Sequence, residues 1–255
     1  MTMKLVFLGS GSAFTVGASN YQSNLLLQRG DDSLLIDAGG DLRFSLNEQH
    51  LTYSDIKNVY ISHLHADHVG GLEWLAINTH FDKNYIGKPN LYVSDDIIQD
   101  LWDRSLSGGL CTLQTEKATL NTFFNVIPVK HEGGFLWGGA KFRLVQSVHV
   151  ISNYTLMPCY GLFIYYNDHR IYFTADSQYA PKQLLDYYEE ATIIFHDCET
   201  SERTTGVHAH YSELATIPAK LKKKMWLYHY NSGKLPDAKA DGFQGFVQKG
   251  QTFLF

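Results

Sequence analysis

The stretch that decides the fold is Ile61-Ser62-His63-Leu64-His65-Ala66-Asp67-His68-Val69-Gly70-Gly71, which follows directly on an apolar, strand-like run. It holds four side chains able to bind a metal, namely His63, His65, Asp67 and His68. On a loop leaving a strand, alternate side chains point the same way, so His63 and His65 can face one point while the next two ligands face a second point nearby. Imidazole and carboxylate donors suit zinc, manganese or iron. A solvated polar turn is the alternative, but such closely spaced histidines would repel one another on protonation unless a metal held them.

Two metal sites need more ligands than one loop supplies, and three further candidates stand at the ends of later apolar runs. These are His149, Asp176 and His229. Taken singly, each is simply a polar residue near a strand end. Taken together with the first four they suffice for two ions if one carboxylate bridges them. Two ions about 3.5 to 4 Å apart share and activate a water while clamping a substrate oxygen, so we expect a binuclear metal-dependent hydrolase.

The composition is that of a mildly acidic globular protein. The chain has 255 residues, of which 44% are hydrophobic, and a formal net charge of -5. No apolar run approaches the roughly 20 residues of a membrane helix and no secretory signal is visible, so we expect a cytoplasmic protein with no membrane partner. Three cysteines without a CxxC pair argue against a disulfide framework. The acidic balance gives no general attraction for long nucleic acid.

Strand-like runs and helical patterns are mixed along the whole chain, with no repeat, linker or low-complexity stretch between them. We therefore expect one domain over residues 1–255, of a layered α/β class. The expected strands are 4–8, 24–28, 33–36, 58–61, 91–93, 125–129, 142–147, 161–166, 170–174, 192–195 and 225–228. The expected helices are 42–49, 72–81, 95–105, 181–188 and 212–221.

These motifs resemble the metallo-β-lactamase superfamily and, within it, the ribonuclease Z-like phosphodiesterase branch. The resemblance runs almost end to end, through the H-x-H-x-D-H element and the segments Phe7-Leu8-Gly9-Ser10-Gly11-Ser12-Ala13, Leu35-Ile36-Asp37-Ala38-Gly39, Phe173-Thr174-Ala175-Asp176-Ser177 and His229-Tyr230-Asn231-Ser232. It implies a four-layer αββα sandwich with two divalent metal ions at one edge of the sheets. Zinc is the expected metal, with manganese and iron as alternatives, and a homodimer is the expected assembly. The family pattern assigns one ion to His63, His65 and His149 and the other to Asp67, His68 and His229, with Asp176 bridging.

The branch also places a carboxylate and a proton-donating histidine in segments that match His196-Asp197 and His208-Ala209-His210. We match the pair to Asp197 and His210, with His208 as the rival, and count Asp67 as catalytic as well as a ligand. Expelling an alkoxide from a phosphodiester is slow unless a group protonates it, and an imidazole held by a carboxylate suits that task. The alternative is that both histidines decorate an exposed loop.

The substrate prediction rests on a missing segment. Transfer-RNA-processing members that resemble this branch carry a long Gly/Pro-rich arm between the third His and the bridging Asp, whereas only 27 positions separate His149 from Asp176. We therefore expect a phosphodiesterase that uses a metal-bridging hydroxide on small or cyclic phosphodiesters, such as cyclic nucleotides or short nucleic acid. The alternatives are a hydrolase of carbonyl esters, lactones or thioesters, a transfer-RNA 3′-processing endoribonuclease, and a nucleotide-sequestering binding protein. We expect residues 78–139 to select the substrate, with a hairpin or flap at 133–139. Aromatic side chains of this segment could stack a base, but we expect most of them in the core or at a dimer face.

Overall fold

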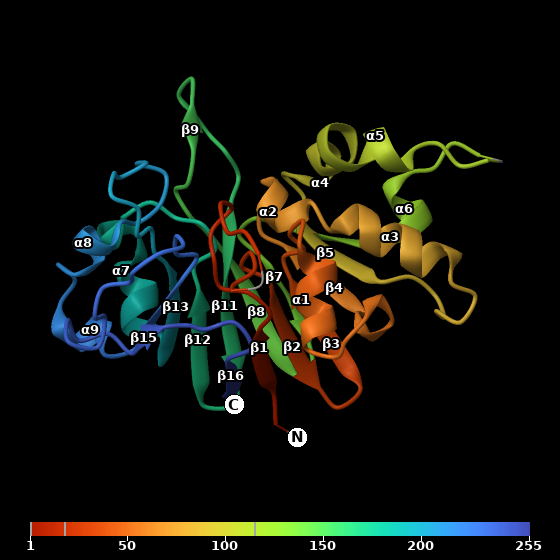
Figure 1. Cartoon of the computed structure of the whole chain (residues 1–255). Helices are drawn as coiled ribbons and strands as arrows, with labels where there is room; N and C mark the ends of the chain where they lie inside the picture. Colours follow the sequence, from red (N-terminus) through yellow and green to blue (C-terminus); the bar gives the residue numbers. More distant parts are fainter. Residues whose placement is uncertain (1, 18, 115) are drawn as a thin grey trace.

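Two seven-stranded sheets form the centre of the computed structural model, which describes residues 2–17, 19–114 and 116–255 (Figure 1). The first consists of β1 (Lys4–Phe7), β2 (Leu25–Arg29), β3 (Asp32–Ile36), β4 (Asn58–Ile61), β5 (Asn90–Ser94), β6 (Asn125–Val129) and β16 (Thr252–Leu254). The second consists of β7 (Gly134–Trp137), β8 (Ala140–Gln146), β11 (Tyr160–Tyr166), β12 (His169–Phe173), β13 (Ile193–Asp197), β14 (Met225–Tyr228) and β15 (Gly245–Phe246). Their orders are β16-β1-β2-β3-β4-β5-β6 and β15-β14-β13-β12-β11-β8-β7.

Alternate strand residues fill the space between the sheets. In β1, Leu5 and Phe7 belong to the central core, whereas Val6 packs on the outer face of the first sheet. In β11, Leu162 belongs to the central core and Phe163 packs on the outer face of the second sheet. Because successive strand side chains point to opposite faces, both faces of each sheet are apolar and both must be covered.

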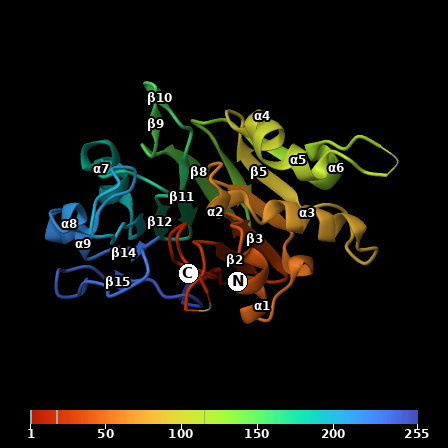
Figure 2. The same cartoon turned by 45° about the horizontal axis from the view of Figure 1, so that its top comes forward.

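Helices cover the two outer faces. The first sheet packs against a cluster that includes Leu46 of α1 (Leu42–Glu48) and Leu75 of α3 (Leu72–Phe81). The second packs against α7 (Pro181–Glu190), α8 (Tyr211–Leu214) and α9 (Ala219–Lys222). The predicted four-layer αββα sandwich is therefore confirmed (Figures 1 and 2). The other elements are η1 (Tyr53–Asp55), α2 (Ala66–Val69), α4 (Ile98–Asp100), η2 (Leu101–Leu106), α5 (Ser107–Leu110), α6 (Leu120–Phe123), β9 (Ile151–Ser152) and β10 (Thr155–Leu156).

Two of the predicted helices are not formed as single helices. The segment 212–221 is divided into α8 and α9, with Pro218 as the residue that precedes α9. Proline has no N–H to continue a helix and its ring clashes with the preceding turn, so the break is expected. The segment 95–105 holds only the short α4 and most of the π-helical η2. The hairpin predicted around 133–139 is formed by β7 and β8.

The order of the strands brings functional residues to one edge. The neighbours β3 and β4 run parallel, and so do β12, β13 and β14 in the second sheet. Their carboxyl ends lie at the edge of the sandwich opposite the two chain termini (Figure 1). Ligand sites in α/β sheets form at the carboxyl ends of parallel strands, so this edge is where side chains from both sheets can meet. Among the described residues, no helix has the length and apolar character needed to cross a bilayer.

Phe142 provides a test of the central core. Its side chain is fully buried and stacks on Phe135 with ring centroids 4.7 Å apart. Phe142→Ala is expected to lower the free energy of unfolding by about 3 to 5 kcal/mol, because the lost transfer energy and the cavity add. Urea denaturation measures this. Phe81→Ala is the control, since Phe81 is 64% exposed and its loss should cost little; equal costs would contradict the proposed packing.

Candidate metal centre

All seven predicted ligands converge at this edge of the sandwich. They form two groups whose donor atoms lie within 4.8 Å of one another. The first group is His63, His65, His149 and Asp176, and the second is Asp67, His68, Asp176 and His229. Asp176 is common to both. The groups draw on both sheets, since His63 follows β4 of the first sheet and His229 follows β14 of the second.

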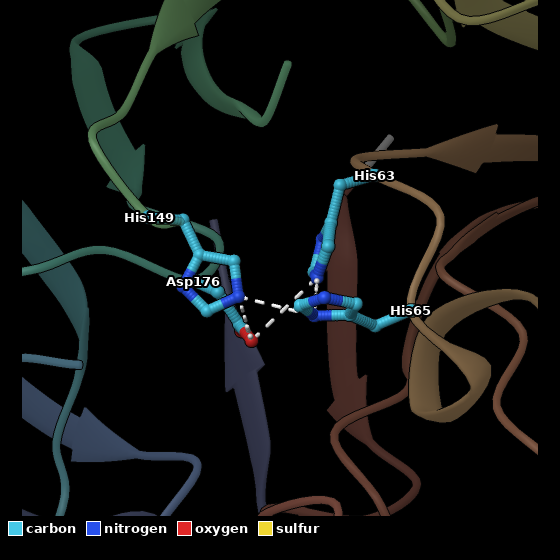
Figure 3. A group of neighbouring side chains, drawn as sticks. All are labelled: His63, His65, His149 and Asp176. Atoms are coloured by element: carbon cyan, nitrogen blue, oxygen red, sulfur yellow. Dashed lines mark hydrogen bonds and ion pairs between the residues drawn. The ribbon is translucent and has the colours of Figure 1, made fainter. Parts of the chain in front are cut away.

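In the first group the donors are spaced like the ligands of a single ion. Nδ1 of His65 lies 3.1 Å from Nε2 of His63 and 3.1 Å from Nε2 of His149. Oδ2 of Asp176 lies 3.7 Å from His63 Nε2 and 3.6 Å from His149 Nε2. Tetrahedral ligands 2.0–2.1 Å from a zinc ion are themselves about 3.3 Å apart. Figure 3 shows the four side chains pointing toward one another, with His63 and His65 on one loop and His149 and Asp176 on two others.

The second group has the same spacing. Oδ2 of Asp67 lies 3.2 Å from Nε2 of His68 and 3.2 Å from Nε2 of His229. Oδ2 of Asp176 lies 3.4 Å and 3.6 Å from the same two nitrogens. A single carboxylate oxygen therefore faces both groups, which is the placement that a bridging ligand requires.

Two buried atoms test whether this cluster suits a cation. Nε2 of His68 and Oδ1 of Asp176 are buried and have no hydrogen-bond partner among the described residues. Burial lowers the pKa of His63 and His149, which favours the neutral imidazole that a metal ligand must be. Burial alone would raise the pKa of Asp176, but His229 and His68 hold it well below its usual range, so the central carboxylate is ionised. The donor set therefore fits divalent metal ions.

The ring nitrogens that face away from the cluster are fixed by other groups. Nδ1 of His68 lies 2.8 Å from Oδ2 of Asp37, and Nδ1 of His149 donates to the Val207 carbonyl at 2.7 Å. Such outer contacts set the tautomer and the orientation of metal-binding histidines. The sequence placed Asp37 in a family motif without giving it a role. Its position directly after a strand, like that of the ligands themselves, was the available signal.

Asp37→Asn tests this outer contact. The amide keeps the shape of the side chain and tolerates the positive φ of 62° at this position, but it offers an N–H toward His68 Nδ1. That N–H favours the tautomer in which His68 Nε2 carries a proton and cannot bind metal. We expect the affinity for one of the two ions to fall about 10- to 100-fold, as measured by calorimetric metal titration. Asp82→Asn, remote from the cluster and bonded to Tyr53, is the control and should bind metal as the wild type does; unchanged affinity in Asp37→Asn would contradict the role.

Three residues at the cluster have a strained backbone. Asp37, Ala175 and His229 have φ values of 62°, 52° and 62°, in the left-handed region that non-glycine residues rarely adopt. Each such residue costs of the order of 1 kcal/mol or more, and residues of this kind gather at functional sites. The strain is held by surrounding contacts, because the backbone N–H of His229 donates to the Ser10 carbonyl at 2.7 Å.

The glycine-rich opening segment is a tight turn beside the cluster. A Cβ at Gly9 would lie 2.2 Å from the Gln22 carbonyl oxygen, so only glycine fits there. The turn brings Ser10 next to His229 and lets the Ser12 N–H donate to the Tyr230 carbonyl at 3.1 Å. The opening and closing motifs of the chain therefore support each other.

A pocket of about 360 Å³ opens over the cluster, a size typical of small-molecule sites. It is lined by Ser12, Ala13, Phe14, His65, Ala66, Asp67, His149, Asp176, Glu199, Thr205, Val207, His208, His229 and Asn231. None of these lies in residues 78–139, so that segment does not line the pocket within the described part of the chain. Its aromatic side chains Phe123, Phe124, Phe135 and Trp137 are buried in the core instead.

The structure corrects the predicted pairing of Asp197 with His210. Asp197 Oδ2 lies 2.8 Å from Nδ1 of His208, the rival residue. His210 points elsewhere, with Nδ1 2.7 Å from Ser212 Oγ and Nε2 3.0 Å from the Ser201 carbonyl oxygen, and it caps the start of α8. His208 lines the pocket and its Nδ1 lies 3.9 Å from Asp176 Oδ2.

The charge environment of His208 favours its protonated form. Burial lowers the pKa of His208, but the neighbouring carboxylates, first of all Asp197, outweigh it, so the net shift is upward. Burial raises the pKa of Asp197, but His208 and His229 outweigh it, so this carboxyl stays ionised. Nε2 of His208 has no hydrogen-bond partner among the described residues and is left for a ligand in the pocket.

Comparison with known proteins finds a family model and relatives that match nearly the whole chain. The model of the family "Anti-Pycsar protein Apyc1" matches residues 3–253. An anti-Pycsar protein Apyc1 from Paenibacillus harenae is 36% identical over 230 residues, which cover 89% of this chain and 90% of that protein. Among solved structures, the metallo-β-lactamase-fold protein YhfI from Bacillus subtilis matches with a TM-score of 0.76 at 20% identity, covering all of both chains. The short form of human tRNase Z matches with a TM-score of 0.66 at 17% identity, covering 98% of both chains.

The resemblance to the metallo-β-lactamase superfamily is thereby confirmed at the level of the fold, which the chain shares with a tRNase Z. At these identities the solved structures show the fold alone. The fold together with the histidine and aspartate cluster supports a metal-dependent hydrolase.

Proposed function

Because the chain belongs to the Anti-Pycsar Apyc1 family, we propose that it is a binuclear metal-dependent phosphodiesterase that cleaves cyclic nucleotides or other small phosphodiesters. The observation that carries this proposal is the position of His208. This imidazole, held by Asp197, lines the same pocket as the shared carboxylate of the two ligand groups. A site that both activates water and protonates a leaving oxygen is what an unactivated phosphodiester needs.

The side chains divide the work as follows. Bound divalent ions supply an activated water and offset charge on the phosphoryl oxygens. Asp67 reaches the pocket from the second ligand group and orients the attacking water. As the bond from phosphorus to the leaving oxygen breaks, His208 gives its Nε2 proton to that oxygen, while Asp197 holds the ring by Nδ1. We propose zinc as the metal because four-donor groups of imidazole and carboxylate suit it, with manganese and iron as alternatives.

The pocket favours small substrates. Its volume of about 360 Å³ suits a single nucleotide better than a folded RNA. The interval from His149 to Asp176, where transfer-RNA-processing relatives would carry an arm, holds only β9, β10, β11 and the following β12. The homodimer, the cytoplasmic location and the single domain over residues 1–255 stay predictions of the sequence.

The test combines metal analysis with a substrate panel. The purified protein is assayed on bis(p-nitrophenyl) phosphate, on cyclic mononucleotides and on a precursor transfer RNA, with Asp176→Ala as the control. We expect about two divalent ions per chain and cleavage of the first two kinds of substrate. Two bound metals with every phosphodiester intact would overturn the proposal and favour carbonyl esters or nucleotide sequestration. Cleavage of the RNA alone would favour transfer-RNA processing.

A further inference from the structure

A buried carboxylate beside the cluster has no part in the proposed chemistry. Glu199 follows β13, is 3% exposed and lines the pocket. Among the described residues it makes no ion pair. A buried charge is costly unless hydrogen bonds compensate it, so the contacts of Glu199 indicate what it does.

The hydrogen bonds of the Glu199 carboxylate to described residues all lie in the loop that follows it. Oε1 of Glu199 accepts from Ser201 Oγ at 2.8 Å, and the backbone N–H of Thr205 donates at 3.2 Å to Oε1 and at 3.0 Å to Oε2. The carboxylate thus ties together the two sides of the loop 200–207. Charge-assisted hydrogen bonds of this kind are stronger than neutral ones.

The far end of that loop carries two parts of the site. The Val207 carbonyl accepts from His149 Nδ1, and the next residue is His208, which is held by Asp197. Just before them stands Gly206, whose φ of 77° is in the left-handed region and where an added Cβ would meet no atom of the described residues within 4 Å. The loop therefore depends on contacts such as those of Glu199 for its shape.

We propose that Glu199 is a positioning residue that holds His208 in line with the leaving oxygen. This inference rests on the proposed phosphodiesterase function. Without the carboxylate, the loop 200–207 loses the hydrogen bonds that join its two sides, while the ring of His208 keeps its contacts with Asp197, His149 and His229. A displacement of about 1 Å at a reacting group is enough to slow a reaction about 100-fold.

The test compares two leaving groups. In a 3′,5′-cyclic nucleotide the water loses a proton to solvent as its oxygen bonds to phosphorus, a P–O bond to the ribose breaks, and the ribose oxygen takes a proton from His208, which solvent then restores. In bis(p-nitrophenyl) phosphate the p-nitrophenolate leaves without a proton. Glu199→Ala is expected to lower kcat about 10- to 100-fold on the cyclic nucleotide and less than about threefold on the nitrophenyl ester. Glu199→Gln keeps one acceptor oxygen and should fall between Ala and wild type.

The controls separate positioning from general damage. Glu213→Gln alters a carboxylate that accepts from the backbone N–H of His210. His210 lies in the same irregular segment as His208, residues 198–210, which we call the strap. The variant should leave both rates unchanged. In a His208→Ala background, Glu199→Ala should cause no further loss on the cyclic nucleotide. Metal content and melting temperature are measured for every variant. If Glu199→Ala loses metal or unfolds, the rates of Glu199→Gln on the two substrates test the positioning role instead.

The outcomes distinguish the two proposals. A wild type that cleaves neither ester overturns the phosphodiesterase function itself. A wild type that cleaves both, with folded and metal-loaded Glu199 variants that slow both esters equally or slow neither, overturns the positioning role alone.

Discussion

Asp176→Ala is expected to abolish hydrolysis of every phosphodiester that the wild type cleaves, with a loss of about three orders of magnitude or more. The reason is the position of one atom. Oδ2 of Asp176 lies within 3.4 to 3.7 Å of donor nitrogens in both ligand groups, so removing it opens both groups at once. Metal content should fall below two ions per chain. Rates on bis(p-nitrophenyl) phosphate and elemental analysis of the purified variant measure the two effects.

Asp95→Ala is the matched control for Asp176→Ala. Asp95 belongs to another acidic group, with Asp96 and His131, but all three side chains are exposed and lie outside the pocket. Its loss should change neither the rate nor the metal content. An Asp176→Ala protein with two bound metals and an undiminished rate would show that the shared carboxylate is dispensable.

The positions of the candidate ligands were predictable because each follows a strand. The H-x-H-x-D-H spacing set the first four, and His149, Asp176 and His229 each stood after an apolar run that the structure shows to be a strand or its continuation. Parallel strands bring such ends together whatever the details of the loops. The αββα layers were predictable for a similar reason, since local periodicity determines which elements form.

The local sequence pattern could not decide whether His208 or His210 lies beside Asp197. The two residues are two positions apart on an irregular strap, and their rings meet different partners. Which ring faces the pocket is set by long-range pairing, because the Ala209 N–H donates to the Ser177 carbonyl and Glu199 pairs with His210. Such contacts join segments far apart in the sequence, and spacing alone does not contain them.

Two other differences between the sequence prediction and the structure have distinct causes. Pro218 inside the predicted helix 212–221 was a visible signal of a break, and the apolar spacing on either side of it obscured that signal. The aromatic residues of 78–139 carried no such signal. Buried Phe135 and an exposed aromatic platform look alike in sequence, since the difference lies in which layer of the sandwich the side chain enters.

His208→Ala is expected to slow cleavage of a cyclic nucleotide about 100-fold or more while both metal ions stay bound. General acids contribute about 10² to 10⁴ in rate, and that contribution is lost with the ring. The metal centre should persist because His208 is a member of neither ligand group, although its ring lies against those of His149 and His229. Bis(p-nitrophenyl) phosphate should be cleaved at close to the wild-type rate, since its leaving group needs no proton. Steady-state kinetics on the two substrates, with metal analysis, measure all three effects.

His210→Ala completes the argument, because it removes an identical ring two residues away. His210 accepts from the Ser212 N–H at the start of α8, so its loss should cost about 1 kcal/mol of stability as a lost helix cap, yet leave both rates within about twofold of wild type. The reverse pattern, with His210→Ala slow on the cyclic nucleotide and His208→Ala unaffected, would restore His210 as the donor and show that the strap shifts when substrate binds. Equal rates in all three proteins would mean that no histidine of this strap protonates the leaving oxygen. The ratio of the rates on the two substrates identifies the proton donor, because a loss of stability alone lowers both rates together.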